Sequence, residues 1–118
     1  MGGFQMRNWM VGCASGAVLV AGLTAGLSAQ DKAKPGDAAK GKDVFDQCSV
    51  CHNADSTETK VGPGLKGLFK MDKLVNGKPV TEANVREIIN AGGNGMPSYA
   101  DQLSDQDKND VIAYLKTL

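Results

Sequence analysis

The chain has 118 residues, 42% of them hydrophobic, which leaves room for one globular domain and excludes a second. Its 13 basic and 13 acidic side chains balance at pH 7, so the chain lacks the excess of Lys and Arg that marks a nucleic-acid-binding protein. Only 5% of the residues are aromatic while 15 are glycine, which predicts a thin core that needs something besides side chains to complete it.

The N-terminal 29 residues have the pattern of an export signal. Arg7 is their only charged residue, and an uncharged run rich in Val, Leu, Ala and Gly follows from Met10 to Ala29. The sequence therefore predicts a signal peptide over residues 1–29 and a periplasmic location for the rest of the chain. Two alternatives stay open. The same 20 uncharged residues are long enough for a retained membrane anchor, and Cys13 could carry the lipid of a lipoprotein.

A short linker and one domain are expected after the signal. Residues 30–36 contain two lysines, a proline and a glycine, a composition typical of a flexible linker, and residues 37–118 are predicted to form the domain. Its first helix is predicted over residues 38–48, where Asp37 is placed to cap the N-terminus. Gly41 inside this helix costs roughly 1 kcal/mol relative to Ala, which indicates that another helix crosses closely at that point.

Two further helices are predicted after a long loop. Residues 53–80 are rich in glycine and carry an Asn-Gly turn signal, which favours a loop. A helix over residues 82–90 follows, capped by Thr81 and ended by two glycines, and a last helix over residues 105–117 has Ser104 as its cap. The side chains expected on the buried helix faces are Val44, Phe45, Cys48, Val85, Ile88, Ile89, Val111, Ile112, Leu115 and Leu118. No strand pattern competes, so the sequence predicts an all-α fold of three or four short helices and long loops.

The reactive side chains are concentrated in one motif, Cys48-Ser49-Val50-Cys51-His52, which holds the only histidine of the chain. Two thiols about one helical turn apart can each add to a vinyl group of a haem. The adjacent imidazole is then brought onto the iron from one side of the ring. The motif therefore predicts one covalently attached haem c, bound by Cys48 and Cys51, with His52 as an iron ligand.

Three other interpretations of the motif are a zinc site, a redox dithiol and a structural disulfide. A structural zinc site needs four ligands, whereas the two cysteines and the histidine supply three. A redox dithiol is expected in a βαβ setting, which the predicted helices do not provide. A disulfide stays open, because an exported protein meets oxidising conditions.

A methionine is the candidate for the second iron ligand, because the chain has no second histidine. Outside the predicted signal the methionines are Met71 and Met96. Met96 is better placed, since Gly95 lets the backbone approach closely and Pro97 stiffens the turn, whereas Met71 lies in a polar loop. A role as a buried gap-filler is the alternative for Met96. A thioether ligand would raise the reduction potential and complete the coordination of the iron, which predicts one-electron transfer.

The motifs together resemble those of small class I cytochromes c. Besides the haem motif, these are Gly62-Pro63-Gly64-Leu65, Gly95-Met96-Pro97-Ser98-Tyr99 and the helix end Val111-Ile112-Ala113-Tyr114-Leu115. The resemblance covers about residues 36–118 and implies a cytochrome c-like fold around one haem c. It also implies that the carbonyl of Pro63 accepts a hydrogen bond from the far nitrogen of His52, and that the first and last helices cross at Gly41.

The combined pattern predicts a monomeric, periplasmic one-electron carrier that exchanges electrons with redox protein partners. The alternative is a cytochrome c subunit committed to one dehydrogenase or oxidase complex. A peroxidase or gas sensor would need an open position at the iron, so this reading requires that Met96 is not a ligand. We expect an electron-transfer protein and not an enzyme, with no nucleic-acid partner, and with a membrane contact only if residues 1–29 stay attached.

Overall fold

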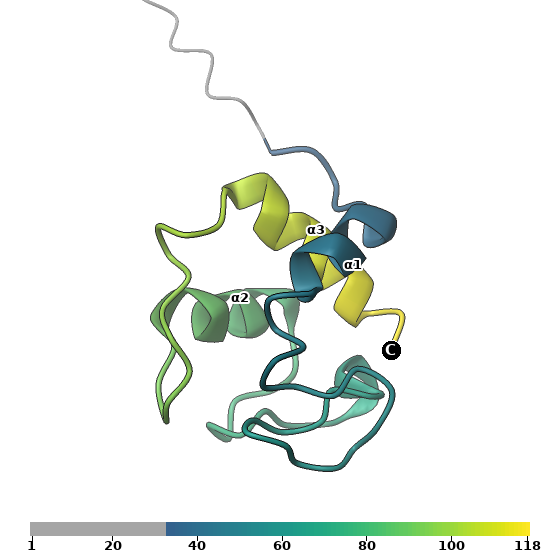
Figure 1. The fold of residues 1–118 in the computed structure, drawn as a ribbon, viewed down its shortest axis with the longest axis vertical. Coiled ribbons are helices and arrows are strands. Elements are labelled where there is room, and N and C mark those ends of the chain that lie inside the picture. Colours follow the sequence, from purple (N-terminus) through teal and green to yellow (C-terminus); the bar gives the residue numbers. More distant parts are fainter. Residues whose placement is uncertain (1–32) are drawn as a thin grey trace, which may run out of the picture. The chain divides into compact units, whose positions relative to one another are not determined.

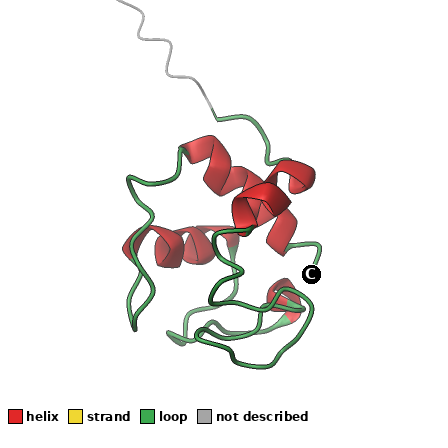
Figure 2. Cartoon of the chain, in the orientation of Figure 1, coloured by secondary structure: helices red, strands yellow, loops and turns green. Residues whose placement is uncertain are grey.

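The computed structural model describes residues 33–118, which form three α-helices and one short 3-10 helix joined by long loops (Figure 1). In chain order these elements are α1 (Ala38–Phe45), η1 (Leu68–Lys70), α2 (Glu82–Ala91) and α3 (Asp105–Leu115). Figure 2 shows how much of the domain is loop, above all between α1 and α2. The described residues contain no strand and only two isolated bridges, so the predicted all-α class is confirmed.

The predicted signal peptide lies outside the described residues, as does the beginning of the predicted linker. Among the helices of residues 33–118, none combines the length and the apolar character that crossing a bilayer requires.

The last residues of the predicted linker are held against α3. The N–H of Lys34 donates to the side-chain oxygen of Gln106 at 2.7 Å, and the amide of Asn109 donates to the carbonyl of Lys34 at 2.9 Å. Gly36 lies against the Asn109 backbone, where a Cβ would have no room. Residues 34–36 are therefore fixed to the domain although the sequence predicts a flexible segment, because side chains of α3 satisfy their backbone groups.

Helix α1 begins as predicted but ends three residues before the predicted end at Cys48. The carboxylate of Asp37 accepts hydrogen bonds from two N–H groups of the first turn, at 2.9 and 3.4 Å. At the other end the N–H of Asp46 bonds to the carbonyl of Asp43, only three residues back, at 3.3 Å. This bond tightens the chain and ends the regular helix, so residues 46–51 continue as a series of turns.

Helix α2 agrees with its predicted range to within one residue. The hydroxyl of Thr81 accepts a hydrogen bond from the N–H of Asn84 at 3.1 Å, as expected of an N-cap. The helix ends at Ala91, and the next residue, Gly92, has a φ of 64°, a value that glycine adopts without strain. Its buried side chains are Val85 and Ile89.

Helix α3 starts with a reciprocal cap. The hydroxyl of Ser104 accepts from the N–H of Asp107 at 3.0 Å, and the carboxylate of Asp107 accepts from the N–H of Ser104 at 2.9 Å. The Ser104 hydroxyl also donates to this carboxylate, at 2.7 Å, and this bond, followed by the one from the Ser104 N–H, lowers the pKa of Asp107 below its ordinary value of 3.8. The regular helix ends at Leu115, two residues before its predicted end, because the N–H of Thr117 bonds to the carbonyl of Tyr114 in a tighter turn at 2.8 Å.

We expect Ser104→Ala to lower the free energy of unfolding by about 1 kcal/mol at neutral pH, because the first turn of α3 loses its acceptor. The carboxylate of Asp107 has a lowered folded-state pKa, so its stabilisation is complete above its ordinary pKa of 3.8 and is lost as the pH falls through the folded-state value. Urea unfolding of the wild type and of Asp107→Ala across the acidic pH range measures this pH-dependent stabilisation. The two stabilities should converge at low pH, and a constant difference would contradict the assignment.

Helices α1 and α3 cross at Gly41, as the resemblance implies. A Cβ on Gly41 would overlap the carbonyl of Asp110, so only glycine allows this approach. Beside the crossing, the rings of Phe45 and Tyr114 pack with their centroids 5.3 Å apart and their planes tilted by 56°. The buried apolar side chains of the core are Phe45, Leu68, Leu74, Val85, Ile89, Leu103, Val111, Ile112 and Leu115.

Two charged side chains of α3, Lys108 and Asp110, are also buried, which the hydrophobic pattern does not predict. Asp110 is 3% exposed, and its carboxylate accepts from the N–H of Asp37 and from the side-chain amide of Gln106, each at 2.8 Å. Asp110 therefore ties the start of α1 to the middle of α3.

Candidate functional site

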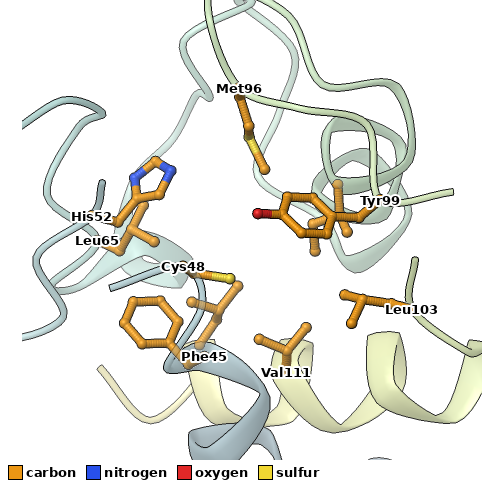
Figure 3. Close-up of a pocket in the computed structure, with 10 residues that line it drawn as sticks. Phe45, Cys48, His52, Leu65, Met96, Tyr99, Leu103 and Val111 are labelled. Atoms are coloured by element: carbon orange, nitrogen blue, oxygen red, sulfur yellow. The ribbon is translucent and has the colours of Figure 1, made fainter. Parts of the chain in front are cut away.

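A mostly apolar cavity lies between the three helices and the two long loops (Figure 3). The turn that follows α1 contributes Cys48 and His52, and the loop between α2 and α3 contributes Met96. The other side chains that line it are Phe45, Leu65, Ile89, Tyr99, Leu103, Val111 and Leu115. The structure thus brings three of the predicted site residues to one space. Met71 is not among the lining residues, and it is 52% exposed.

The imidazole of His52 is held in one orientation. Its Nδ1 lies 2.8 Å from the carbonyl oxygen of Pro63, which is the hydrogen bond that the resemblance implies. Because a carbonyl oxygen can only accept, Nδ1 carries the proton and Nε2 keeps its lone pair free for a metal. Gly62 packs against the ring, and a Cβ there would overlap the imidazole. Backbone groups of one loop therefore fix both the position of His52 and its tautomer.

The two cysteines of the motif are placed by the turns after α1. The N–H groups of Cys51 and His52 both bond to the carbonyl of Cys48, at 3.0 and 2.9 Å, so the three residues share one tight turn. Cys48 and Cys51 are partly buried and free, with no disulfide between them. Burial, and to a lesser degree the neighbouring Cys51, raises the pKa of the Cys48 thiol above its ordinary value of 9.0. Cys48 is therefore a neutral thiol at physiological pH.

A tight turn carries Met96 to the cavity. Gly93 and Met96 exchange two backbone hydrogen bonds, at 2.9 and 3.0 Å, across Asn94 and Gly95. Both central residues have positive φ, 52° and 88°, as in the two-residue turns that Asn-Gly sequences favour. Beyond the turn, the N–H of Tyr99 bonds to the carbonyl of Ile89 at 3.0 Å and fixes the loop to α2. In Figure 3 the Met96 side chain points from this loop into the cavity.

Tyr99 also lines the cavity, a role that the sequence does not predict for it. Its hydroxyl points into the cavity, between Met96 and Cys48 in Figure 3. Burial, followed by the nearby cysteines, raises the pKa of Tyr99 above its ordinary value of 10.0, so the hydroxyl stays protonated. Its position three residues after Met96, at the end of a turn signalled by Asn94-Gly95, is the signal that could have pointed to it.

The arrangement fits a covalently bound haem better than the other candidates. The donor set combines two free thiols in one turn, an imidazole with Nε2 free and a thioether, around walls that are almost entirely apolar. Within residues 33–118 no group of three or more His, Cys, Asp and Glu side chains is arranged to hold a metal ion, which argues against zinc. The redox dithiol lacks its βαβ setting, because the described residues contain no strand.

Comparison with known proteins identifies the family. A family model for cytochrome c matches residues 38–118. The cytochrome c2 of Blastochloris viridis is 33% identical over 115 residues, which cover 83% of this chain and 91% of that protein. The cytochrome bc1 complex cytochrome c subunit of Corynebacterium diphtheriae is 31% identical over 94 residues, which cover 78% of this chain but only 31% of that subunit.

Comparison of the fold with solved structures leads to the same family as comparison of the sequence. The crystal structure of cytochrome c6 from the diatom Phaeodactylum tricornutum superposes with a TM-score of 0.56 at 27% identity, over 70% of this chain and 93% of that one. The matched residues 38–118 include α1, α2, α3 and the whole of the haem motif. The chain belongs to the cytochrome c family, and it is an electron-transfer protein with covalently bound haem c.

Proposed function

We propose that this protein is a periplasmic one-electron carrier whose haem c is attached to Cys48 and Cys51 and ligated by His52 and Met96. The observation that carries the proposal is that His52 and Met96 reach one apolar cavity from two separate loops. A thioether ligand beside an imidazole ligand would favour ferrous iron and raise the reduction potential. If both residues hold the iron, no coordination position would remain for a substrate, and the activity would be to accept and donate one electron.

The haem supplies the one-electron couple when bound, and the residues of the chain set its surroundings. Pro63 holds the proton on Nδ1 of His52, which fixes the ring and makes Nε2 a stronger donor. The turn at Asn94-Gly95 directs the Met96 sulfur into the cavity. The apolar walls exclude water, which disfavours the oxidised form because it carries the larger positive charge.

The proposed location rests on the sequence before the domain. We assign residues 1–29 as a signal peptide that is cleaved, residues 30–36 as the segment that leads into the domain, and residues 37–118 as the haem domain. The single charge at Arg7, the uncharged run after it and the small residues before Gln30 support this assignment. Attachment of the haem needs both cysteines in the reduced form. At the proposed location, the domain would meet its redox protein partners outside the cytoplasmic membrane.

A second candidate function is a cytochrome c subunit committed to one complex. It is favoured by the similarity to a relative that is itself named as a subunit of a cytochrome bc1 complex. This chain matches under a third of that subunit's length, since the matched part covers 31% of it. The free carrier is favoured by the match to cytochrome c2, of which 91% is covered.

Isolation of the native protein from its own cells separates these functions. A free carrier should be recovered without detergent and without other subunits, with a mass that corresponds to a chain starting near Gln30 plus one haem. Its ferrous form should not bind carbon monoxide, because the iron has no vacant position. A full-length chain recovered only with detergent would establish a retained anchor. Stable copurification with a dehydrogenase or oxidase would establish the committed subunit.

A further inference from the structure

Lys108 occupies a position in α3 where the packing calls for an apolar side chain. It lies three, four and seven residues before Val111, Ile112 and Leu115, so all four residues belong to one face of the helix. That face is buried, and Lys108 itself is 5% exposed. A buried ammonium group is costly unless it is hydrogen-bonded or paired, so its partners should show what it does.

The ammonium group of Lys108 has one close partner. Nζ donates to the carbonyl oxygen of Ala100 at 2.8 Å. The nearest carboxylate is that of Asp105 at 3.9 Å, and the Asp105 side chain is 81% exposed. Because this carboxylate is distant and mostly exposed to water, it offsets little of the free-energy cost of burying the ammonium group. The hydrogen bond to Ala100 is therefore the main interaction that keeps Lys108 in place.

Ala100 belongs to the segment that carries Met96. Residues 96–103 are fixed to α2 near their start, through the N–H of Tyr99 and through the hydroxyl of Ser98, which donates to the carbonyl of Asn90. Among the hydrogen bonds of the described residues, the one from Lys108 is the only one that joins this segment to α3. Figure 1 shows the segment as the yellow-green loop that leads from α2 to the start of α3.

The segment and the helix both form walls of the cavity. Met96, Tyr99 and Leu103 line it from the loop, while Val111 lines it from α3, one turn after Lys108. Figure 3 shows Met96 and Val111 facing the same space from these two elements. A change in how the loop lies on α3 would therefore change how far the Met96 sulfur reaches into the cavity.

We propose that Lys108 is a positioning residue for Met96, which holds the ligand loop onto α3 through the carbonyl of Ala100. The inference rests on the proposed ligation by Met96. Without the ammonium group the loop has hydrogen bonds to α2 alone, so conformations with Met96 withdrawn become more populated. A ligand that competes with Met96 binds only those conformations, and its apparent affinity rises in proportion to their population.

Lys108→Met tests the inference, because methionine keeps the apolar stem of lysine and removes the ammonium group. We expect the affinity of the ferrous holoprotein for carbon monoxide to rise by about tenfold or more, which corresponds to the loss of one hydrogen bond to a charged group. The sulfur-to-iron absorption in the near infrared should weaken at a lower temperature than in the wild type. Lys108→Arg keeps a charged donor and should return both readouts toward the wild-type values.

Lys116→Met is the matched control, since it makes the same substitution at the end of the same helix, where the lysine pairs with Glu82 and is 46% exposed. It should leave carbon monoxide binding unchanged. A Lys108→Met protein with wild-type affinity overturns the inference, even if its stability has changed. If a wild type with all its haem attached already binds carbon monoxide, the Met96 ligand itself is wrong and the inference falls with it.

If Lys108→Met fails to fold, the wild type still provides a test. An ammonium group held by one carbonyl should give a slowly exchanging Nζ resonance with a scalar coupling to the carbonyl carbon of Ala100. A freely exchanging Lys108 ammonium without this coupling would overturn the inference.

Discussion

Met96→Ala should lower the reduction potential by on the order of 0.1 V, because axial ligands set the potentials of protein haems over a range of about 0.8 V. Loss of the thioether would remove the ligand that favours ferrous iron and would leave a coordination position open. The ferrous variant should therefore bind carbon monoxide and lack the sulfur-to-iron absorption in the near infrared. Redox titration and absorption spectroscopy of the purified holoprotein measure all three changes.

Met71→Ala is the matched control for this experiment. Met71 is 52% exposed and lies outside the cavity, so its removal should leave the potential and the spectrum unchanged. A Met96→Ala protein with a wild-type potential would contradict ligation by Met96. Loss of the near-infrared absorption in Met71→Ala would assign the ligand to Met71, although this side chain does not line the cavity that His52 lines.

Replacing both Cys48 and Cys51 by Ala should abolish covalent haem and the folded state together. The cavity that Cys48 borders touches side chains of all three helices, so without a bound haem a large part of the core is left unfilled. Native domains are stable by only about 5–15 kcal/mol, so we expect the chain without that packing to stay unfolded. Denaturing gels stained for haem and near-ultraviolet circular dichroism measure the two effects.

Cys13→Ala is the control, because it is the same substitution at the one cysteine outside the motif. The Cys13→Ala protein should keep its haem after denaturation. A double variant that lacks haem but shows native near-ultraviolet signals and cooperative unfolding would contradict the role of the haem in the core. A double variant that keeps haem after denaturation would contradict attachment through Cys48 and Cys51.

The sequence predicts best where the signal is local. The bounds of α2 follow from Thr81 at one end and Gly92 at the other, since each acts on its own turn of the chain. The haem motif is equally local, because the chemistry needs the two thiols and the imidazole in adjacent turns. The neighbours of Met96, a glycine before it and a proline after it, also favour it over Met71 as the predicted ligand, and in the structure Met96 lines the cavity whereas Met71 does not.

The features that the sequence did not predict depend on distant partners. The burial of Lys108 depends on a carbonyl eight residues back, and that of Asp110 on the N–H of Asp37 at the other end of the domain. Their charge alone predicts surface positions for both residues, although helical spacing places Lys108 on the same face as Val111 and Leu115. The fixed conformation of residues 34–36 has the same origin, because the side chains that hold it come from α3. Helix η1, with three residues, is too short to give a periodic pattern.

The crossing of α1 and α3 also constrains when the domain can fold. The hydrogen bond between Asp37 and Asp110 spans 73 residues, and closing a loop of that length costs about 4 kcal/mol of chain entropy before any contact compensates for it. On a growing chain, α1 emerges long before the helix that covers it. A nascent chain without α3 therefore has no partner for the face that carries Gly41 and Phe45. The domain can gain its stability only after α3 has been made, so the chain stays unfolded until then, which is the state that the proposed export would require.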